Sequence, residues 1–188
     1  DDIAHVLQHV PSSDFRGIDF IVLRQPKRKE EIINPVWGRL AYFAEVGPHQ
    51  GRAIFIEALN PSKPMRWSKS LTPVWQWELE RLRGDGHEIV TTKHEHEINV
   101  SLESIRATQL YRTLLHEIGH SVDYDRNAVA FDRKSPLEKE TFARQYADKL
   151  RASLVRFGII PFARMFDKKT MARDGLSVSD FTVDGERP

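Results

Sequence analysis

Two histidines one helical turn apart, His116 and His120 in the pentapeptide HEIGH, constrain this chain more than any other feature. Residues four apart on an α-helix share one face, with Cβ atoms about 5–6 Å apart, so two imidazoles there can bind one metal ion. Glu117 follows the first histidine and projects beside the pair, where it can reach a water on that metal. We therefore expect a helix here that carries a metal on its polar face.

The residues around HEIGH predict one helix from Ser101 to Asp123. Ser101 is a suitable N-cap, and Glu103 in the first turn complements the helix dipole. Gly119 costs about 1 kcal/mol relative to Ala in mid-helix, so another segment is expected to approach closely there. The two histidines lie opposite the apolar stripe, which leaves a metal site or a solvated polar face. That stripe comprises Tyr111, Leu114, Leu115, Ile118 and Val122.

A second predicted helix, from Ser135 to Phe157, offers the third ligand that a catalytic zinc usually takes. Ser135 is the expected N-cap, and Glu138 completes a capping box. Glu140 lies near the inner face of this helix, and an inward carboxylate needs a partner such as a metal ion. The expected inner face comprises Leu137, Ala143, Ala147, Leu150 and Leu154.

Two alternatives remain open for the third ligand. Glu140 and Arg144 are four residues apart, so they can instead form an ion pair on the helix surface. Asp123 or Asp125, shortly after HEIGH, can supply the ligand in place of Glu140.

With these residues, the chain resembles the gluzincin branch of the zincin metallopeptidases. HEIGH and a glutamate twenty residues beyond His120 carry the resemblance, and the run ETFARQYA is similar to a helix of small bacterial peptidases of the ImmA type. The resemblance covers Val90 to Leu150, about a third of the chain. It departs from the gluzincin pattern at Arg144, where many members have an aspartate. The longer metzincin form is excluded, because Asp123 and Arg126 stand where that form has glycine and histidine.

The resemblance implies a zinc-dependent metallopeptidase that hydrolyses peptide bonds, and we expect an endopeptidase with one or a few protein substrates. His116, His120 and Glu140 would hold one Zn²⁺. Glu117 would be the general base that takes a proton from the attacking water and passes it to the leaving amine. A Tyr or His often stabilises the oxyanion in zincins. The candidates for that role are Tyr124, Tyr146, His94 and His96.

The segment before the helix, Gly86 to Ser101, has the β-branched and alternating character of a strand or hairpin. Zincins usually present an edge strand beside the active helix, where an extended substrate adds as another strand. Residues Glu95 to Val100 are the expected edge. His94 and His96 would share one strand face, which suits a substrate contact or a second metal, although such a pair is more often only solvated.

The order of elements predicts an α+β fold, with a twisted and mostly antiparallel sheet packed against the HExxH helix and the following ligand-bearing helix. We expect a single domain over residues 1–188. Its tail from 157 to 188 is poorly patterned, and either wraps the surface or covers the cleft as an autoinhibitory segment. The other expected helices cover Asp1–Val10 and Thr72–Gly84, and the other expected strands cover Gly17–Arg24, Val36–Val46 and Arg52–Leu59.

Composition narrows the classes of function. The chain has no cysteine, which removes disulfides and cysteine catalysis, and its formal net charge of +1 argues against broad electrostatic binding of nucleic acid. No signal peptide and no apolar run of about 18 residues are present, so a soluble protein is expected, with a cytoplasmic location slightly favoured. The expected partner is a peptide or protein substrate.

Three rival functions are compatible with the sequence. The first is a catalytically silent zincin-fold binding or regulatory protein, and the second is a zinc hydrolase of a non-peptide amide. The third is a nucleic-acid-associated protein that uses the basic run RQPKRK, Arg24 to Lys29, although such a run is more often a solvated loop. Trp67, Trp75 and Trp77 can line a substrate cleft, but are more often core and rim residues.

Overall fold

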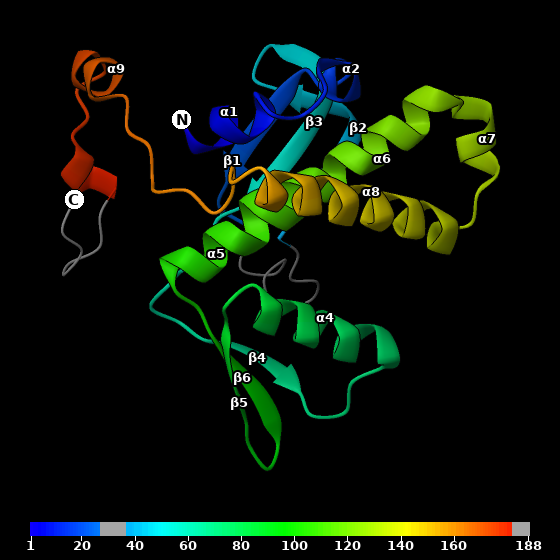
Figure 1. Cartoon of the computed structure of the whole chain (residues 1–188), viewed down its shortest axis with the longest axis vertical. Helices are drawn as coiled ribbons and strands as arrows, with labels where there is room; N and C mark the ends of the chain where they lie inside the picture. Colours follow the sequence, from blue (N-terminus) through cyan, green and yellow to red (C-terminus); the bar gives the residue numbers. More distant parts are fainter. Residues whose placement is uncertain (27–36, 182–188) are drawn as a thin grey trace.

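The computed structural model describes residues 1–26 and 37–181 (Figure 1). The chain forms an α+β fold of two small sheets and several helices, which confirms the predicted class. The elements from the N-terminus to β6 are α1 (Asp2–Leu7), α2 (Ser12–Phe15), β1 (Phe20–Arg24), β2 (Gly38–Val46), β3 (His49–Glu57), β4 (Met65–Ser68), α4 (Pro73–Gly84), β5 (Glu88–Thr91) and β6 (Glu95–Asn99). The remaining elements are α5 (Leu102–Thr108), a π-helical turn (Gln109–Thr113), α6 (Leu114–Arg126), α7 (Ala128–Arg133), α8 (Pro136–Arg156), α9 (Lys168–Arg173) and a 3₁₀ turn (Val178–Phe181).

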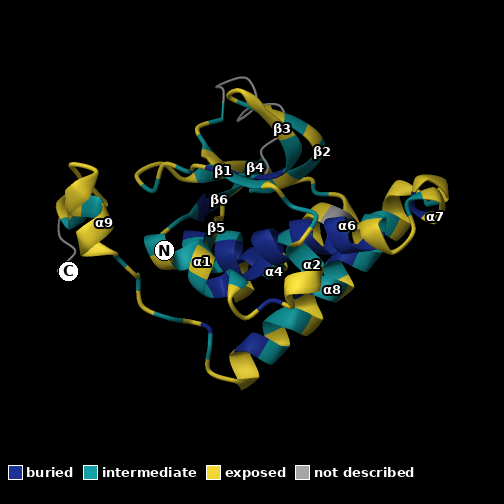
Figure 2. Ribbon diagram, turned by 90° about the horizontal axis from the view of Figure 1, so that it is seen from above, coloured by how far each residue is buried: buried dark blue, intermediate teal, exposed yellow. Residues whose placement is uncertain are grey.

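The expected sheet is divided into two sheets of three strands each. The first has the order β1-β3-β2, with β1 parallel and β2 antiparallel to the central strand. Ile54 and Ile56 of β3 join the apolar residues of α6 in the larger core, which lies beneath this sheet in Figure 2. The second sheet, β4-β6-β5, is antiparallel and packs with α4 around a smaller core of Leu79, Leu82 and Ile98.

The helix that carries HEIGH begins at its predicted cap and runs further than expected. The Ser101 hydroxyl accepts a hydrogen bond from the backbone N–H of Ser104, and the helical path continues through α5, the π turn and α6 to Arg126. All members of the predicted apolar stripe are buried in the core. The one-helix prediction is thus confirmed, except that Gln109–Thr113 takes π geometry.

Helix α8 packs against α6 at Gly119, which confirms the prediction that another segment approaches closely at this glycine. A Cβ at Gly119 would lie 2.9 Å from both the Cα and the carbonyl oxygen of Ala143. The capping box of Ser135 and Glu138 is also confirmed. The prediction for Leu137 is wrong, because this residue lies six positions before the contact at Ala143, about 9 Å along the helix, and is 72% exposed.

The predicted edge strand is a central strand. Strand β6 (Glu95–Asn99) pairs with β4 on one side and β5 on the other, so neither side of it can accept a substrate strand. The strand that lies at a sheet edge beside α6 is β2, whose Tyr42 hydroxyl donates a hydrogen bond to the His120 carbonyl. The four-residue strand β4 occupies the side that was expected to be free.

The described part of the tail runs along the N-terminal helix and away from the HEIGH motif (Figure 1). The Phe162 carbonyl accepts a hydrogen bond from Arg106, and the Met165 N–H donates one to Asp2. Residues 157–181 therefore wrap the surface and do not cover the cleft. No helix in the described part of the chain is long and apolar enough to cross a membrane.

Candidate metal centre

The two histidines of α6 and Glu140 of α8 converge as predicted. The Nε2 atoms of His116 and His120 lie 3.1 Å apart. The Glu140 carboxylate reaches both rings, with Oε2 3.2 Å from the His116 Nε2 and Oε1 3.4 Å from the His120 Nε2. Each residue offers a ligand atom within 4.8 Å of the others, so the three could hold a metal ion together, and they are called the metal group below.

The spacing of these atoms fits zinc. Zn–N bonds of about 2.0–2.1 Å in a tetrahedral site place two nitrogens about 3.3–3.4 Å apart, close to the separations in this group. Two imidazole nitrogens that face each other also need a proton or a cation between them, because their lone pairs repel. Two imidazoles and one carboxylate form a donor set typical of a catalytic zinc site that leaves one position open.

Glu140 is only half buried, so it lies less far inward on α8 than its predicted place near the inner face implied. Its side chain is 51% exposed, yet its carboxylate points at the two histidines. Hydrogen bonds from His116 and His120 hold the pKa of Glu140 well below its usual value. The alternative surface pair with Arg144 is not formed, because the Arg144 guanidinium lies over the ring of Trp77, 3.9 Å from its centroid.

The carboxyl group of Glu117 is buried beside the same histidines. Burial raises the pKa of Glu117, and the nearby charges of His116 and His120 offset part of that effect. Burial lowers the pKa of His120, but the hydrogen bond that its ring donates to Glu140 and the charge of Glu117 more than offset this effect, so the pKa of His120 is raised. Glu117 thus favours its protonated form more than an exposed carboxyl does.

Both aspartates considered as third ligands lie elsewhere. The Lys134 ammonium donates a hydrogen bond to Asp123, 2.5 Å away. Asp125 accepts a hydrogen bond of 2.8 Å from Arg52. Other partners hold both of these carboxylates, and Glu140 is the carboxylate that converges with the two histidines.

The four candidates for oxyanion stabilisation are not brought to the metal group. The Tyr146 hydroxyl donates a hydrogen bond to Asp14, and the Tyr124 ring packs against Tyr42 and Phe131. His96 forms a hydrogen bond with Thr91 within the β5–β6 hairpin, and His94 is exposed in the turn before β6. None of them lines the pocket in front of the histidines.

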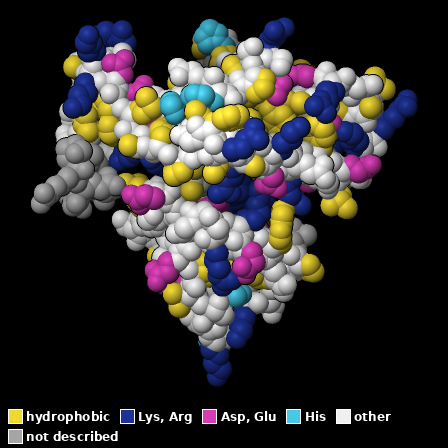
Figure 3. Space-filling model, in the orientation of Figure 1, with side chains coloured by type: hydrophobic (Ala, Val, Ile, Leu, Met, Phe, Trp, Pro, Cys, Tyr) yellow, Lys and Arg dark blue, Asp and Glu magenta, His cyan; other side chains and the backbone are white. Residues whose placement is uncertain are grey.

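That pocket has a volume of about 290 Å³ and joins the metal group to α4 and to the start of β2. Every tryptophan of the chain lines it: Trp37, Trp67, Trp75 and Trp77. Trp67 also packs against the smaller core, and Trp75 and Trp77 are each 39% exposed, in line with the prediction of core and rim residues. Figure 3 shows Lys and Arg side chains gathered in the hollow between α8 and α4, where Arg81, Arg112 and Arg144 line the pocket.

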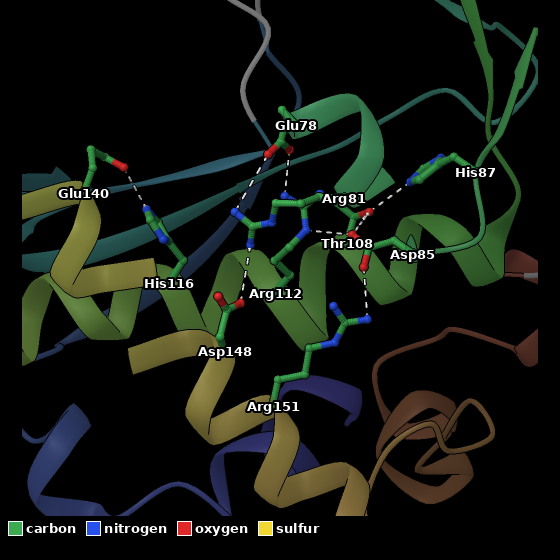
Figure 4. A network of polar contacts seen from close by, with 10 residues as sticks. All are labelled: Glu78, Arg81, Asp85, His87, Thr108, Arg112, His116, Glu140, Asp148 and Arg151. Atoms are coloured by element: carbon green, nitrogen blue, oxygen red, sulfur yellow. Dashed lines mark hydrogen bonds and ion pairs between the residues drawn. The ribbon is translucent and has the colours of Figure 1, made fainter. Parts of the chain in front are cut away.

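A network of charged side chains lies next to the metal group (Figure 4). Arg112, which is 6% exposed at its side chain, donates hydrogen bonds of 2.6 Å to both Glu78 and Asp85. Arg151 pairs with the other Asp85 oxygen, and Thr108 donates to the oxygen that Arg112 also uses. The network fixes the π turn against α4 and holds Arg112 at the pocket.

Sequence reasoning singled out Arg144 but missed Arg81 and Arg112, the other two arginines of this pocket. The available signal was spacing, because Arg112 precedes His116 by four residues, as His116 precedes His120. Residues at this spacing share a helix face. Arg81 and Trp37 gave no such signal, because they reach the pocket from separate elements.

Residues 27–29, the second half of the basic run Arg24 to Lys29, lie outside the described residues. The Arg24 side chain, which is described, donates hydrogen bonds to the buried Glu57. Comparison of the chain with protein-family models, with curated proteins and with solved structures found no match.

Proposed function

We propose that this protein is a zinc-dependent metallopeptidase of gluzincin-like type that hydrolyses peptide bonds. One observation carries the proposal: His116, His120 and Glu140 present their donor atoms to one point, beside the buried carboxyl group of Glu117. Structural zinc sites usually have four protein ligands, whereas a set of three with a carboxyl group alongside is typical of hydrolytic sites.

Each residue of the group has a separate role in the proposed reaction. When bound, zinc acts as a Lewis acid that polarises the scissile carbonyl and lowers the pKa of a coordinated water. His116, His120 and Glu140 hold the ion. The Glu117 carboxylate accepts a proton from the attacking water and donates it to the leaving amine, a transfer that its raised pKa favours.

The substrate is proposed to bind along the free edge of β2. This strand lies at the end of its sheet order, and its first residue, Gly38, lines the pocket together with His116 and Glu117. An extended peptide can add to such an edge through main-chain hydrogen bonds. In this arrangement, β2 replaces β6 as the proposed substrate-binding strand.

The test combines metal content with hydrolysis. Protein stripped with a chelator and then given zinc is expected to retain about one ion per chain, the single-site stoichiometry, and to cleave members of a mixed peptide library. In E117Q, cleavage is expected to fall about 10²–10⁴-fold with zinc retained. E138Q, which alters a capping glutamate on the surface of α8, serves as the control with normal activity.

Two results would contradict this proposal. Failure to take up zinc at neutral pH would exclude the metal site. Equal cleavage by E117Q and the unaltered protein would exclude the role of Glu117. A protein that binds zinc and keeps its cellular effect in E117Q would instead be a silent binding protein.

A second candidate is a zinc hydrolase that acts on a small non-peptide amide. The pocket volume of about 290 Å³ favours it, because this volume is just below the range of about 300–1,000 Å³ for ligand pockets and so suits a small substrate. The peptide library separates the two functions. Cleavage of small acyl amides without cleavage of any peptide would select this candidate.

A further inference from the structure

Three arginines and three glutamates line the pocket beside the metal group: Arg81, Arg112, Arg144, Glu78, Glu117 and Glu140. The Glu140 carboxylate faces the two histidines and not an arginine. Arg112 pairs with Glu78 and Asp85, Arg151 pairs with Asp85, and Arg81 lies within ion-pair distance of Glu78 and Asp148. These three arginines are thus matched by three carboxylates.

Arg144 is the cation left over at this pocket. Among the described residues, no carboxylate lies within ion-pair distance of its guanidinium, which instead stacks on Trp77. Arg144 is one helical turn beyond the metal ligand Glu140 on α8, so a group bound by Arg144 would lie close to the metal. Stacking fixes the plane of the guanidinium while its N–H groups remain able to donate.

Three guanidinium N–H groups at this pocket lack an acceptor within the described part of the chain. The atoms are Arg81 Nη2, Arg112 Nη2 and Arg144 Nε, and all three are buried. A buried donor without a partner costs roughly 1–3 kcal/mol. These three atoms are shielded from the cavity, so a ligand cannot reach them there. The Nη atoms of Arg144 are not among the shielded atoms, and they can donate to an acceptor-rich anion in the pocket.

Aromatic side chains make up much of the rest of the pocket lining. Trp67 and Trp75 pack edge to face with ring centroids 5.0 Å apart, and Arg81 and Arg144 both lie over the Trp77 ring. This aromatic lining suits a bulky apolar side chain. A ligand that fits both the arginines and the tryptophans therefore carries an anionic group next to an apolar one.

We propose that this pocket binds a carboxylate of the substrate through Arg144, supported by Arg81 and Arg112, while the tryptophans hold an adjacent apolar side chain. A carboxylate matches the planar fork of a guanidinium and accepts two parallel hydrogen bonds. The proposal rests on the proposed peptidase function and assigns its substrate class. The carboxylate comes from the C-terminus of a peptide or from an acidic side chain, and the source decides between an exopeptidase and an endopeptidase.

Binding is measured separately from turnover with two pairs of probes. N-acetyl-Ala-Phe with a free C-terminus is compared with its amide, and N-acetyl-Phe-Glu-Ala-amide is compared with its Gln counterpart. Titrations follow tryptophan fluorescence and calorimetric heat in E117Q, because all four tryptophans line the pocket. Zinc-loaded and chelator-treated samples are both used, which separates binding by arginine from coordination to the ion.

In one of the two pairs, the probe with a free carboxylate is expected to bind about 10–100-fold more tightly than its neutral partner. This ratio is the one expected for a hydrogen bond to a charged group. R144Q should reduce the affinity for the acid to that for the neutral probe, and R144K should keep part of the preference. R156Q is the matched control, since Arg156 lies on the same helix and stacks on Phe157 away from the pocket.

Three results would overturn this proposal. They are equal affinity for both members of each pair, equal loss of affinity for both members in R144Q, and no binding of any probe. The probe comparison needs no arginine variant, so it remains decisive even if R144Q does not fold. If chelator-treated protein prefers the probe with a carboxylate, carboxylate binding by this pocket is supported even when zinc uptake or hydrolysis fails. This result therefore separates the proposed binding pocket from the proposed peptidase function.

Discussion

Gly119 is the residue at which the metal-binding helix and α8 come closest. A methyl group there would approach Ala143 backbone atoms at 2.9 Å, and backbone cannot rotate away as a side chain can. We expect G119A to lower the free energy of unfolding by about 1–3 kcal/mol, despite the better helix propensity of alanine. It should also weaken zinc binding, because α8 carries Glu140.

Urea denaturation and zinc titration test this expectation. G84A is the matched control, since nothing lies within 4 Å of a Cβ at Gly84 in the last turn of α4. That variant should be neutral or slightly stabilising. Equal stability of G119A and G84A would contradict the close packing of α6 on α8.

Glu140 and Glu138 lie two residues apart on α8 and provide a second matched pair. E140Q removes the charge of the proposed third ligand, and we expect zinc affinity to fall by at least about 100-fold, because a charge-assisted ligand is lost. E138Q removes half of a capping box and should cost only about 0.5–1 kcal/mol of stability with normal zinc affinity. Competition with a chromophoric chelator measures both, and equal zinc affinities would remove Glu140 from the site.

Residue-level predictions succeeded where helix geometry alone decides them. His116, Glu117 and His120 all lie on helix α6, so its geometry alone places them. Placing Glu140 required only the correct prediction of which face of α8 it lies on. The oxyanion candidates failed because proximity in sequence does not determine proximity in space. Tyr124 and Tyr146 lie within a few residues of a ligand on faces that point to other partners.

At the scale of elements, the π turn (Gln109–Thr113) is fixed by buried charge. Asp85, whose side chain is inaccessible, accepts hydrogen bonds from Arg112 and Thr108 and pairs with Arg151. D85N leaves Arg112 with Glu78 as its remaining carboxylate partner. Breaking one side of a buried pair costs about 3–5 kcal/mol, and we expect this loss in urea denaturation.

Asp148 supplies the control for that experiment. It is 58% exposed and lies 4.0 Å from Arg81, so D148N should cost less than about 1 kcal/mol. Similar losses in the two variants would show that the network around Asp85 contributes no more than a surface pair.

Elements with strong local signals were predicted well, and short ones were not. The caps Ser101 and Ser135 determine where two helices begin, and both are confirmed. Strand β4 (Met65–Ser68) has four residues, too few for an alternating pattern to be recognised. Missing β4 led directly to the wrong prediction of an edge strand at β6.

For the whole molecule, the pocket is a product of tertiary structure. Its tryptophans come from the residue before β2, from β4 and from α4, which lie up to forty residues apart in sequence. Periodicity predicts the face of one element, but the meeting of three elements depends on sheet order and helix packing. The sequence therefore predicted that His116, His120 and Glu140 converge, and missed the cavity that lies beside them.

His87 links the smaller core to α5 and makes the stability of the molecule depend on pH. Its Nε2 lies 2.9 Å from the Thr108 hydroxyl, and its ring packs near Trp37. Burial lowers the pKa of His87 below its ordinary 6.5, and the charge of Arg112 adds to this, while the charges of Asp85 and Glu78 offset part of it. The folded protein thus binds the proton less readily than the unfolded chain.

The sign of the effect follows from that difference. As the pH falls below about 6.5, the unfolded chain takes up a proton at this position before the folded protein does, so the free energy of unfolding decreases. The loss continues down to the lowered pKa of the folded state and amounts to about 1.4 kcal/mol for each unit of depression. Urea denaturation at pH 7.5 and pH 5 is expected to show this decrease, and H87Q should show a smaller one. The difference between the two proteins isolates His87 from the other groups that titrate in this range, and equal decreases would mean that burial of His87 does not set the acid sensitivity of the fold.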